Sequence, residues 1–337
     1  MKIEENFPLR QLNTFGIEAF ARYFAAIKSE DELIEAVSGK FRSDKVLVIG
    51  DGSNIVFKGD FDGLVMKSAM RGIRIIPEHD LDNPLVEAHS GESWQNLVDF
   101  ALSNGLYGIE NLAAIPGSVG AAPVQNIGAY GVEIRDVLHS VEAIDIRSGK
   151  SIAFSNSECE FGYRHSIFKG ALNGRCFVTK ILLKLSKTPS FKIDYSGLRQ
   201  KLSSAGSQLS ARLIAGTIEK IRRERLPDPS KIGNCGSFFK NCLVTEDAYN
   251  ELKCRFPAIP GFEESSGLIK IPSAWLIEEC GWKGYRRGDA AVYPGHALIL
   301  VNYGNAAGAD ILTLAEEITG SVYERFGLML ELEAQVI

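Results

Sequence analysis

Two short segments of this 337-residue chain carry side chains that could take part in catalysis. In CEFGYRHSIFK, residues 159–169, Arg164 follows Gly-Tyr and has aromatic residues on both sides. An arginine held rigidly in such a segment can bind a carboxylate through two parallel hydrogen bonds, and a surface arginine is the alternative. In GNCGSFFKN, residues 233–241, Ser237 lies between a glycine turn and two phenylalanines, with no histidine nearby in the sequence. Cys235 is the other candidate nucleophile.

A first glycine-rich segment could bind a phosphate through its backbone. Gly50-Asp51-Gly52-Ser53-Asn54 resembles half of a dinucleotide fingerprint, but the third glycine would fall at Ile55, and the residues that follow predict a strand where the fingerprint needs a helix. Such a turn can still direct successive N–H groups at one phosphate. Taken alone, these residue types favour a simple β-turn.

A second segment favours ligand binding by the first one over a simple β-turn. AAIPGSVGAAPVQNIGAYG, residues 113–131, consists mainly of glycine, alanine and proline, which predicts an ordered, buried loop and argues against a flexible linker. Glycines leave room for something flat or bulky to lie against the backbone; here they are Gly117, Gly120, Gly128 and Gly131. Close packing of one strand on another is the alternative. Together the two segments indicate a large nucleotide cofactor, and FAD is the best candidate.

The composition excludes several classes of protein. The formal charge of −5 and the pI near 5.7 argue against binding to nucleic acid or anionic lipid, which needs a basic surface. The N-terminal residues contain no long apolar stretch, and no segment approaches the length of a membrane span. We therefore expect a soluble cytoplasmic protein with no nucleic-acid or membrane partner.

The cysteines and histidines predict neither disulfides nor a metal site. None of the six cysteines forms a C-x-x-C pair, and we expect them to be reduced core residues. The five histidines are scattered along the chain, and we expect each to be a surface or structural residue; they are His79, His89, His139, His165 and His296.

The order of predicted elements is that of an α+β protein. A capping box at Ser29 and Glu32 opens a first helix, and a second one at Thr313 and Glu316 opens a last helix that ends at Gly327. Other helices are predicted at 93–102, 210–224, 246–255 and 273–280. Strands are predicted at 45–50, 55–57, 141–146, 176–185 and 328–333. Two prolines in LPDP, residues 226–229, mark a domain boundary.

Seven motifs in order along nearly the whole chain resemble one family. They are NTFG (13–16), IGDGSN (49–54), IPGSVGAAPVQNIGAYG (115–131), FGYRHSIFK (161–169), LPDP (226–229), GSFFKN (236–241) and LELE (330–333). Each is weak alone, but the combination of the alanine-glycine loop, FGYR and GSFFKN is highly specific. The chain resembles the MurB family of UDP-N-acetylenolpyruvoylglucosamine reductases, in the subtype that folds a tyrosine-bearing loop over its substrate.

The resemblance implies a fold and a division into domains. The fold is the split FAD-binding fold of the vanillyl-alcohol oxidase (PCMH) group, with a separate α+β substrate-binding domain. Residues 1–66 would form the first FAD-binding subdomain. Residues 67–224, with a C-terminal strand at about 328–337, would form the second. Residues 225–327 would bind the substrate.

The resemblance also implies a reaction. A bacterial cytoplasmic enzyme, expected to be a monomer, would use NADPH and non-covalent FAD to reduce the enolpyruvyl ether of UDP-N-acetylglucosamine to UDP-N-acetylmuramate for peptidoglycan. Arg164 matches the residue that binds the substrate carboxylate, and Glu333 a carboxyl group that shapes protonation of the enolate. Ser237 matches the proton donor; a serine that protonates a strongly basic carbon does not need an activating histidine. Cys235, which is alanine in many relatives, is then a packing residue.

Binding residues carry over position by position. Those for FAD are Gly50, Asp51, Gly52, Ser53, Asn54, Gly117, Ser118, Gly120, Ala121, Asn126, Gly128, Tyr130 and Gly131. Those for the substrate are Tyr163, Tyr195, Arg222, Asn241, Lys270 and Lys283. The chain departs from the family pattern at Phe262, where relatives can use tyrosine, and at His296, where they can use glutamine. Ala334 and Gln335 replace a charged continuation.

Two other functions remain as alternatives. A different flavin oxidoreductase on the same fold, such as an alcohol or lactone oxidase, often attaches FAD through a histidine, and neither candidate loop contains one. A non-catalytic nucleotide-binding regulator would keep the glycine loops but has no reason to keep Arg164, Ser237 and Glu333 together.

Overall fold

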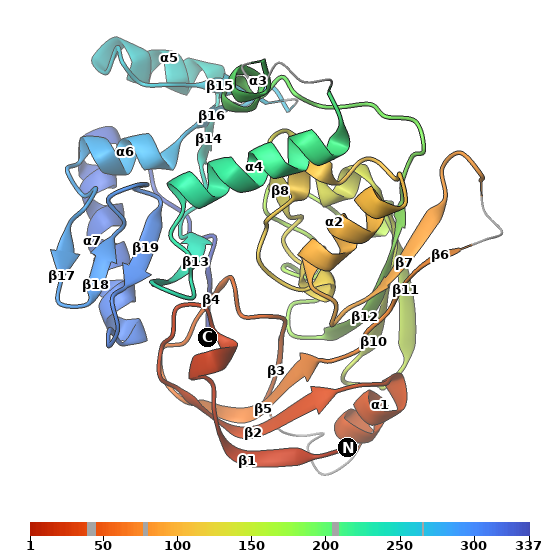
Figure 1. Ribbon diagram of the computed structural model, residues 1–337. Coiled ribbons are helices and arrows are strands. Elements are labelled where there is room, and N and C mark those ends of the chain that lie inside the picture. Colours follow the sequence, from red (N-terminus) through yellow and green to blue (C-terminus); the bar gives the residue numbers. More distant parts are fainter. Residues whose placement is uncertain (39–44, 77–79, 204–208, 265) are drawn as a thin grey trace. The chain divides into compact units, whose positions relative to one another are not determined.

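The computed structural model describes residues 1–38, 45–76, 80–203, 209–264 and 266–337 (Figure 1). His79 lies outside these residues. The chain forms two compact units: unit 1 is Met1–Phe7, Ala21–Asp51 and Phe61–Glu224, and unit 2 is Pro8–Phe20, Gly52–Asp60 and Arg225–Ile337. The predicted division into three ligand-binding domains stays a prediction. Within the described ranges, no helix is long and apolar enough to cross a membrane.

The first sheet of unit 1 has the strand order β1-β2-β5-β3, and β5 pairs in parallel with both β2 and β3. Its strands are β1 (Ile3–Pro8), β2 (Phe20–Ile27), β3 (Val46–Ile49) and β5 (Phe61–Ser68). α1 (Glu30–Ser38) follows β2, and the Ser29 hydroxyl accepts a hydrogen bond from the Glu32 amide, which is one half of the predicted capping box. The Glu32 carboxylate accepts from the Lys28 amide, where the predicted box has the Ser29 amide. Apolar residues of α1, β2 and β5 share one buried core.

The second sheet of unit 1 is antiparallel, with the order β11-β10-β12-β7-β6. Its strands are β6 (Ile73–Ile76), β7 (Leu85–His89), β10 (Leu138–Asp145), β11 (Ser151–Ser155) and β12 (Cys176–Lys184). The helices of this part are α2 (Trp94–Ser103), α3 (Ser196–Ser203) and α4 (Ala211–Arg225). α2 buries Trp94, Leu97, Val98 and Ala101, the face that its apolar spacing predicts. α4 buries its isoleucines in the same core.

Short elements hold the loops of unit 1. The strands β8 (Gly128–Ala129) and β9 (Val132–Glu133) pair with each other. The 3-10 turns are η2 (Glu110–Leu112), η3 (Val119–Ala121), η4 (Ile134–Asp136) and η5 (Ser157–Cys159). The alanine-glycine segment is therefore an ordered loop, as predicted, although many of its residues are only half-buried.

Unit 2 contains a four-stranded antiparallel sheet with the order β13-β19-β18-β17. Its strands are β13 (Gly233–Ser237), β17 (Arg286–Arg287), β18 (Ala290–Val292) and β19 (Ile299–Asn302). A smaller sheet consists of β14 (Cys242–Val244), β15 (Phe262–Glu263) and β16 (Ile269–Ile271). The helices are η1 (Arg10–Leu12), α5 (Glu246–Arg255), α6 (Ser273–Glu279) and α7 (Gly308–Phe326). β4 (Ile55–Val56) pairs in parallel with β20 (Gln335–Val336).

The last helix begins earlier than predicted. α7 starts at Gly308, where the carboxylate of Asp310 accepts a hydrogen bond from the Ala307 amide. The predicted start at Thr313 is wrong because the buried face already includes Ile311, so burial extends the helix by more than one turn. The Thr313 hydroxyl donates to the Ala309 carbonyl inside the helix. The predicted end is confirmed: Gly327 adopts φ +72° at the C-cap.

The predicted terminal strand is also displaced. Residues 328–333 make only an isolated bridge between Leu332 and Phe239, and the strand itself is β20. Alternating side chains in LELE suggested a strand, but a strand needs a continuous partner, and here the pairing with β4 begins only at Gln335.

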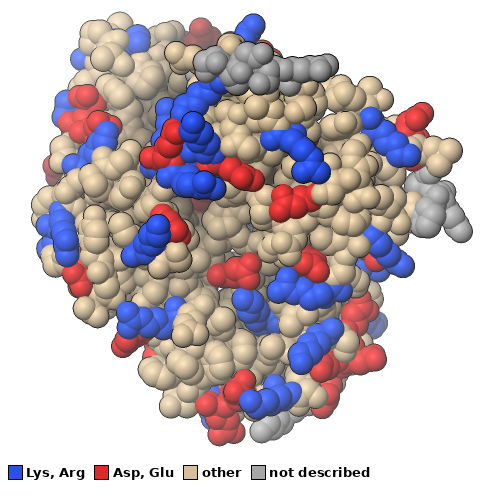
Figure 2. Space-filling model, viewed as in Figure 1, with Lys and Arg blue, Asp and Glu red and all other residues tan. Residues whose placement is uncertain are grey.

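Charged residues of both signs lie close together on the face drawn in Figure 2. This matches the modest net charge and the many surface ion pairs. All six cysteines are free; Cys159 and Cys235 are buried, as expected for core residues. Cys254 is exposed on α5, so the core assignment is wrong for that residue.

Candidate active site

The glycine turn at residues 50–54 joins β3 to β4, the strand-to-strand connection that the sequence predicts. Gly52 has φ +67°, and a Cβ there would lie 2.0 Å from the Leu12 carbonyl oxygen. Only glycine fits this position. The Thr14 amide and hydroxyl both donate to the Gly52 carbonyl, at 3.0 and 3.2 Å. The turn is therefore fixed by the NTFG segment.

Gly50 lies against the alanine-glycine loop within unit 1. A Cβ on Gly50 would come 2.4 Å from Ser118 Oγ and 3.1 Å from the Ala121 Cβ. The structure thus brings the two predicted cofactor segments together at this point. Asp51, next in the turn, forms an ion pair with Lys67 at 3.0 Å.

Two residues of the loop have structural explanations of their own. Gly120 packs on Ser90: its amide donates to the Ser90 carbonyl, and an added Cβ would lie 2.5 Å from Ser90 Cβ. Asn126 is fully buried and its amide donates to Glu133 Oε2 and the Gly162 carbonyl. Close packing therefore accounts for these two residues, and their contacts with a cofactor stay predictions.

Arg164 lies in a tight turn closed by reciprocal backbone hydrogen bonds between Gly162 and His165. It adopts φ +52°, a conformation that non-glycine residues rarely take. Its Nη2 donates to the Gly128 carbonyl at 2.9 Å, and its guanidinium lies 5.4 Å from the centre of the Tyr163 ring. The arginine is half-buried. Its contacts hold it against the loop, as expected of a side chain that binds a carboxylate in one fixed orientation.

Three other predicted residues of unit 1 are Tyr130, Tyr195 and Arg222, and Arg222 is close enough to Arg164 for their charges to interact. The Tyr130 and Tyr195 rings meet edge to face, with their centres 5.4 Å apart. Arg222, on α4, donates from Nε to the Ala114 carbonyl at 3.0 Å. Burial and the nearby charge of Arg164 lower the pKa of Arg222, whereas Tyr130 raises it. Unit 1 therefore gathers two arginines and two tyrosines, a set that suits an anionic ligand.

In unit 2, Ser237 ends β13 next to Gly236, which adopts φ +75°. The Phe238 carbonyl accepts a hydrogen bond from the Glu333 amide at 2.9 Å. The Asn54 side chain donates to the Glu333 carbonyl at 3.1 Å. The structure thus brings the predicted proton donor, the predicted carboxyl group and one predicted cofactor residue together in unit 2.

Cys235 lies in the same strand and is buried. Burial, and then the charge of Glu333, raises the pKa of its thiol. A thiol that stays protonated is a poor nucleophile. This supports its role as a packing residue and argues against nucleophilic catalysis by Cys235.

The remaining substrate residues of unit 2 already have protein partners. Lys270 forms an ion pair with Glu264, and Lys283 forms one with Glu278. The Asn241 side chain accepts from the Ser273 amide at 3.1 Å, at the start of α6. A substrate phosphate would have to compete with the two carboxylates for the lysines.

The two positions that depart from the family pattern differ in environment. The Phe262 side chain is exposed. His296 is half-buried, and its Nδ1 accepts from the Leu298 amide. Burial and the positive charges of Arg225 and Lys283 lower its pKa, so this histidine is neutral at pH 7. Within the described ranges, no group of three metal-binding side chains occurs.

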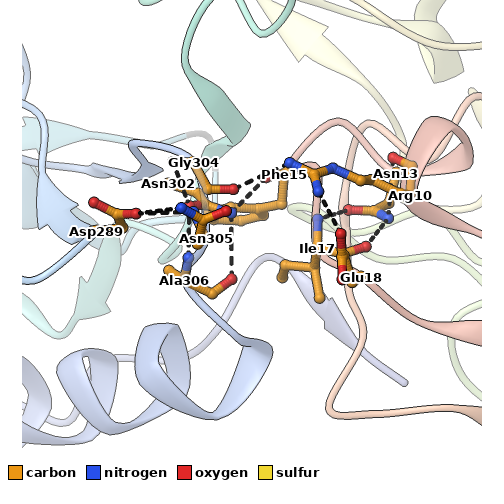
Figure 3. Close-up of polar contacts among 10 residues, drawn as sticks. All are labelled: Arg10, Asn13, Phe15, Ile17, Glu18, Asp289, Asn302, Gly304, Asn305 and Ala306. Carbon is orange, nitrogen blue, oxygen red and sulfur yellow. Dashed lines mark hydrogen bonds and ion pairs between the residues drawn. The ribbon is translucent and has the colours of Figure 1, made fainter.

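The NTFG motif is a structural support (Figure 3). Asn13 is buried, and its amide donates to the Leu9 carbonyl. The amide also donates to the Ile17 carbonyl, and the side-chain oxygen accepts from the Ile17 amide. The Thr14 carbonyl accepts from the Asn234 amide of β13. The Phe15 carbonyl accepts from the Asn302 side chain of β19. The motif therefore links the glycine turn to the strand that carries Ser237.

Comparison with known proteins identifies the class first. A model of the FAD binding domain matches residues 21–155. A model of the UDP-N-acetylenolpyruvoylglucosamine reductase C-terminal domain matches residues 228–337. The chain is therefore a flavin oxidoreductase that contains FAD, and the predicted α+β fold with an FAD-binding domain is confirmed.

Full-length relatives then give the family. A UDP-N-acetylenolpyruvoylglucosamine reductase of Pseudomonas syringae pv. tomato is 44% identical over 335 residues, covering 99% of this chain and 98% of the relative. One of Amoebophilus asiaticus is 42% identical and covers both chains fully. The crystal structure of the reductase (MurB) from Thermus caldophilus, 24% identical, has the same fold, with a TM-score of 0.68 over 100% of this chain and 99% of that one. This chain belongs to the UDP-N-acetylenolpyruvoylglucosamine reductase family.

Close packing within the protein explains both glycines of the turn, and their contact with an FAD diphosphate stays a prediction. At Gly52 the backbone of Leu12 and Asn13 occupies the space that a side chain would need. At Gly50 a side chain would collide with Ser118. Gly131, with φ +81°, has no atom within 4 Å of where a Cβ would stand, so a ligand could approach its backbone closely. Such backbone can bind phosphate through N–H groups.

Sequence reasoning missed the residues that hold the loop in place. Gln95 accepts a hydrogen bond from the Ala114 amide, and Asn111 donates to the carbonyls of Tyr130 and Lys192. Asn111 is buried, and its side-chain oxygen has no partner among the described residues. Gln95 lies among other polar residues of α2, such as Asn96 and Asp99, so the sequence carried no signal that singled it out.

Proposed function

We propose that this enzyme uses NADPH to reduce the enolpyruvyl ether of UDP-N-acetylenolpyruvoylglucosamine to UDP-N-acetylmuramate. We place the reaction in the cytoplasm, as a step in peptidoglycan precursor synthesis. Identity over the full length of relatives that carry the reductase name supports the substrate. The observation on which the chemistry depends is the hydrogen bond from the Glu333 amide to the Phe238 carbonyl, because it holds the predicted carboxyl group beside the residue that follows Ser237.

The reaction adds one hydride and one proton across the enolpyruvyl double bond. FAD, held by the two glycine-rich segments, would supply the hydride when bound, with NADPH as the source of that hydride. The hydride joins the terminal carbon, and the electron pair of the double bond moves onto the neighbouring carbon and its carboxylate. Arg164 stabilises that charge with a planar guanidinium already fixed by Gly128. Ser237 then gives its hydroxyl proton to the neighbouring carbon.

Glu333 assists the protonation in this proposal. It is buried, with 9% of its surface exposed, and its backbone is fixed on both sides by Phe238 and Asn54. A buried carboxyl group close to Ser237 can influence the proton affinity of the hydroxyl and return its proton after turnover.

The substrate-binding residues divide by chemistry. Arg222, Lys270 and Lys283 are the cationic candidates for the diphosphate. Tyr163, Tyr195 and Asn241 are the candidates for the sugar and the base. Tyr195 is 55% exposed, which suits a residue that covers a ligand after it binds.

The test separates the two half-reactions under anaerobic conditions. Ser237→Ala should leave FAD content and reduction of the flavin by NADPH unchanged, because neither needs the hydroxyl. Reoxidation by the enolpyruvyl substrate should slow by roughly 10²- to 10⁴-fold, the usual value of general acid catalysis. Ser237→Cys should recover part of the rate, since a thiol is also a proton donor.

Cys235→Ala is the matched control in the same strand and should turn over within about twofold of wild type. Product formation by Ser237→Ala within a few-fold of wild type would show that another group delivers the proton. FAD should also be released by mild denaturation in near-stoichiometric amount, since the two loops provide backbone contacts and no covalent anchor. A colourless protein that FAD cannot reconstitute would rule out the assignment of the loops.

A further inference from the structure

The guanidinium of Arg222 is oriented by a hydrogen bond from its Nε atom. Its Nε donates to the Ala114 carbonyl at 3.0 Å. Within the described ranges it makes no ion pair, and burial lowers the pKa of its guanidinium. Because all guanidinium N–H groups lie in one plane, the position of the Ala114 carbonyl sets how the other nitrogens of Arg222 are presented to a ligand.

Ala114 has an uncommon conformation that needs support. Its φ is +58°, where an alanine side chain is crowded by its own backbone and glycine is the usual choice. Such a conformation persists only where neighbouring groups fix it. Here both of its polar backbone groups are bound by side chains: the carbonyl by Arg222, and the amide by Gln95 Oε1 at 2.7 Å.

Gln95 is itself held in one orientation. Its Nε2 donates to Asp99 Oδ1 at 3.0 Å and to Glu219 Oε1 at 3.3 Å. With both carboxylates on the nitrogen side, the amide oxygen is left for Ala114. Glu219 precedes Arg222 by three residues on α4, so the two lie on the same face of that helix. The interactions therefore form a closed ring from α4 through Gln95 and Ala114 back to α4.

The neighbouring residue fixes the loop independently of Gln95. The Trp94 amide donates to the Gly117 carbonyl, and the Trp94 indole donates to the Leu112 carbonyl, each at 2.9 Å. The loop therefore stays attached on both sides of Ala114 when Gln95 is changed. What Gln95 adds is the orientation of one peptide group between those two points.

We propose that Gln95 is a positioning residue: through the Ala114 peptide it orients the Arg222 guanidinium toward the diphosphate of the bound substrate. This inference rests on the proposed function, in which Arg222 contacts that substrate. It assigns a role in substrate affinity to a residue that lies outside the set predicted from the sequence.

The test compares Gln95→Met, which keeps the size of the side chain and loses its amide, with Asn96→Leu. Asn96 is the adjacent exposed residue on α2, and its substitution is matched in the same way. In the holoenzyme, Gln95→Met should raise the substrate KM and the calorimetric Kd by about tenfold. It should leave kcat, the rate of flavin reduction by NADPH and Tm close to wild type. Asn96→Leu should change none of these by more than about twofold.

A double-mutant cycle with Arg222→Lys tests the route of the effect. If Gln95 acts through Arg222, Gln95→Met should weaken substrate binding by less than about twofold when residue 222 is already lysine. Ala114→Gly, which removes the crowding at φ +58°, should restore most of the affinity lost in Gln95→Met. Full additivity with Arg222→Lys, or a loss of affinity matched by a loss of Tm, would overturn the inference.

The wild-type control separates the two proposals. Failure of the wild-type holoenzyme to bind or reduce UDP-N-acetylenolpyruvoylglucosamine would overturn the proposed function and this inference with it. Normal turnover by wild type, together with unchanged substrate affinity in Gln95→Met, would overturn this inference alone.

Discussion

Asn302→Ala should destabilise unit 2 far more than Asn305→Ala, the substitution of an exposed asparagine in the same network (Figure 3). Asn302 is 3% exposed. Its amide donates to the carbonyls of Phe15 and Ala306, and its oxygen accepts from the amides of Gly304 and Ala306. Removing the side chain takes a partner away from all four backbone groups at once.

The size of the expected loss in the free energy of unfolding follows from these four hydrogen bonds. A hydrogen bond inside a protein contributes about 0.5–1.5 kcal/mol net, and a buried group left without a partner costs about 1–3 kcal/mol. Four bonds would total roughly 2–6 kcal/mol, and water that enters the space left by the side chain recovers part of it. We expect a loss of about 3 kcal/mol in the free energy of unfolding, which lowers Tm by roughly 6–12 °C.

The assay is urea unfolding with FAD at one fixed excess, because a ligand that binds the folded state adds to its stability. Asn305→Ala is the control: that side chain is exposed and donates one 3.3 Å hydrogen bond to Asp289, so its loss should cost less than about 0.5 kcal/mol. If Asn302→Ala cost under about 1 kcal/mol, or no more than the control, the network would not support the NTFG segment as we describe.

Three further changes test other parts of the structure. Gly52→Ala should cost at least about 1–2 kcal/mol of stability, because φ is +67° and the Leu12 carbonyl lies in the way, whereas Gly59→Ala, with no atom within 4 Å of the added Cβ, should be nearly neutral in the same urea-unfolding assay. Arg164→Lys should slow reoxidation of the flavin by substrate and leave its reduction by NADPH intact, since lysine keeps the charge but loses the planar fork; equal loss in both half-reactions would make the arginine structural. Because the folded pKa of His296 is lowered, the unfolded chain binds the proton first as pH falls below about 6.5, so stability should decrease there, and His296→Gln should reduce that decrease in melts at pH 8 and pH 5.5; identical pH profiles would contradict the burial argument.

The sequence by itself determined the local elements and the family. Apolar spacing predicts α2 and α4, proline and glycine mark where elements end, and α5 begins and ends where its sequence predicts. These features depend on residues a few positions apart, so a single sequence contains them. The seven motifs are sufficient for the family because their order and spacing extend over nearly the whole chain.

The tertiary structure alone decided which of the predicted residues meet and what supports them. Asn54 and Glu333 are 279 positions apart, and Gln95 and Glu219 are 124 apart; no local pattern indicates such a contact. The start of α7 depended on burial of Ile311, and the terminal strand on where β4 offers a partner. Close packing on Ser90 explained Gly120, a glycine that the sequence alone assigned to the cofactor. A residue type shows what a position could do, but burial and hydrogen bonding depend on neighbours that folding brings from distant parts of the chain.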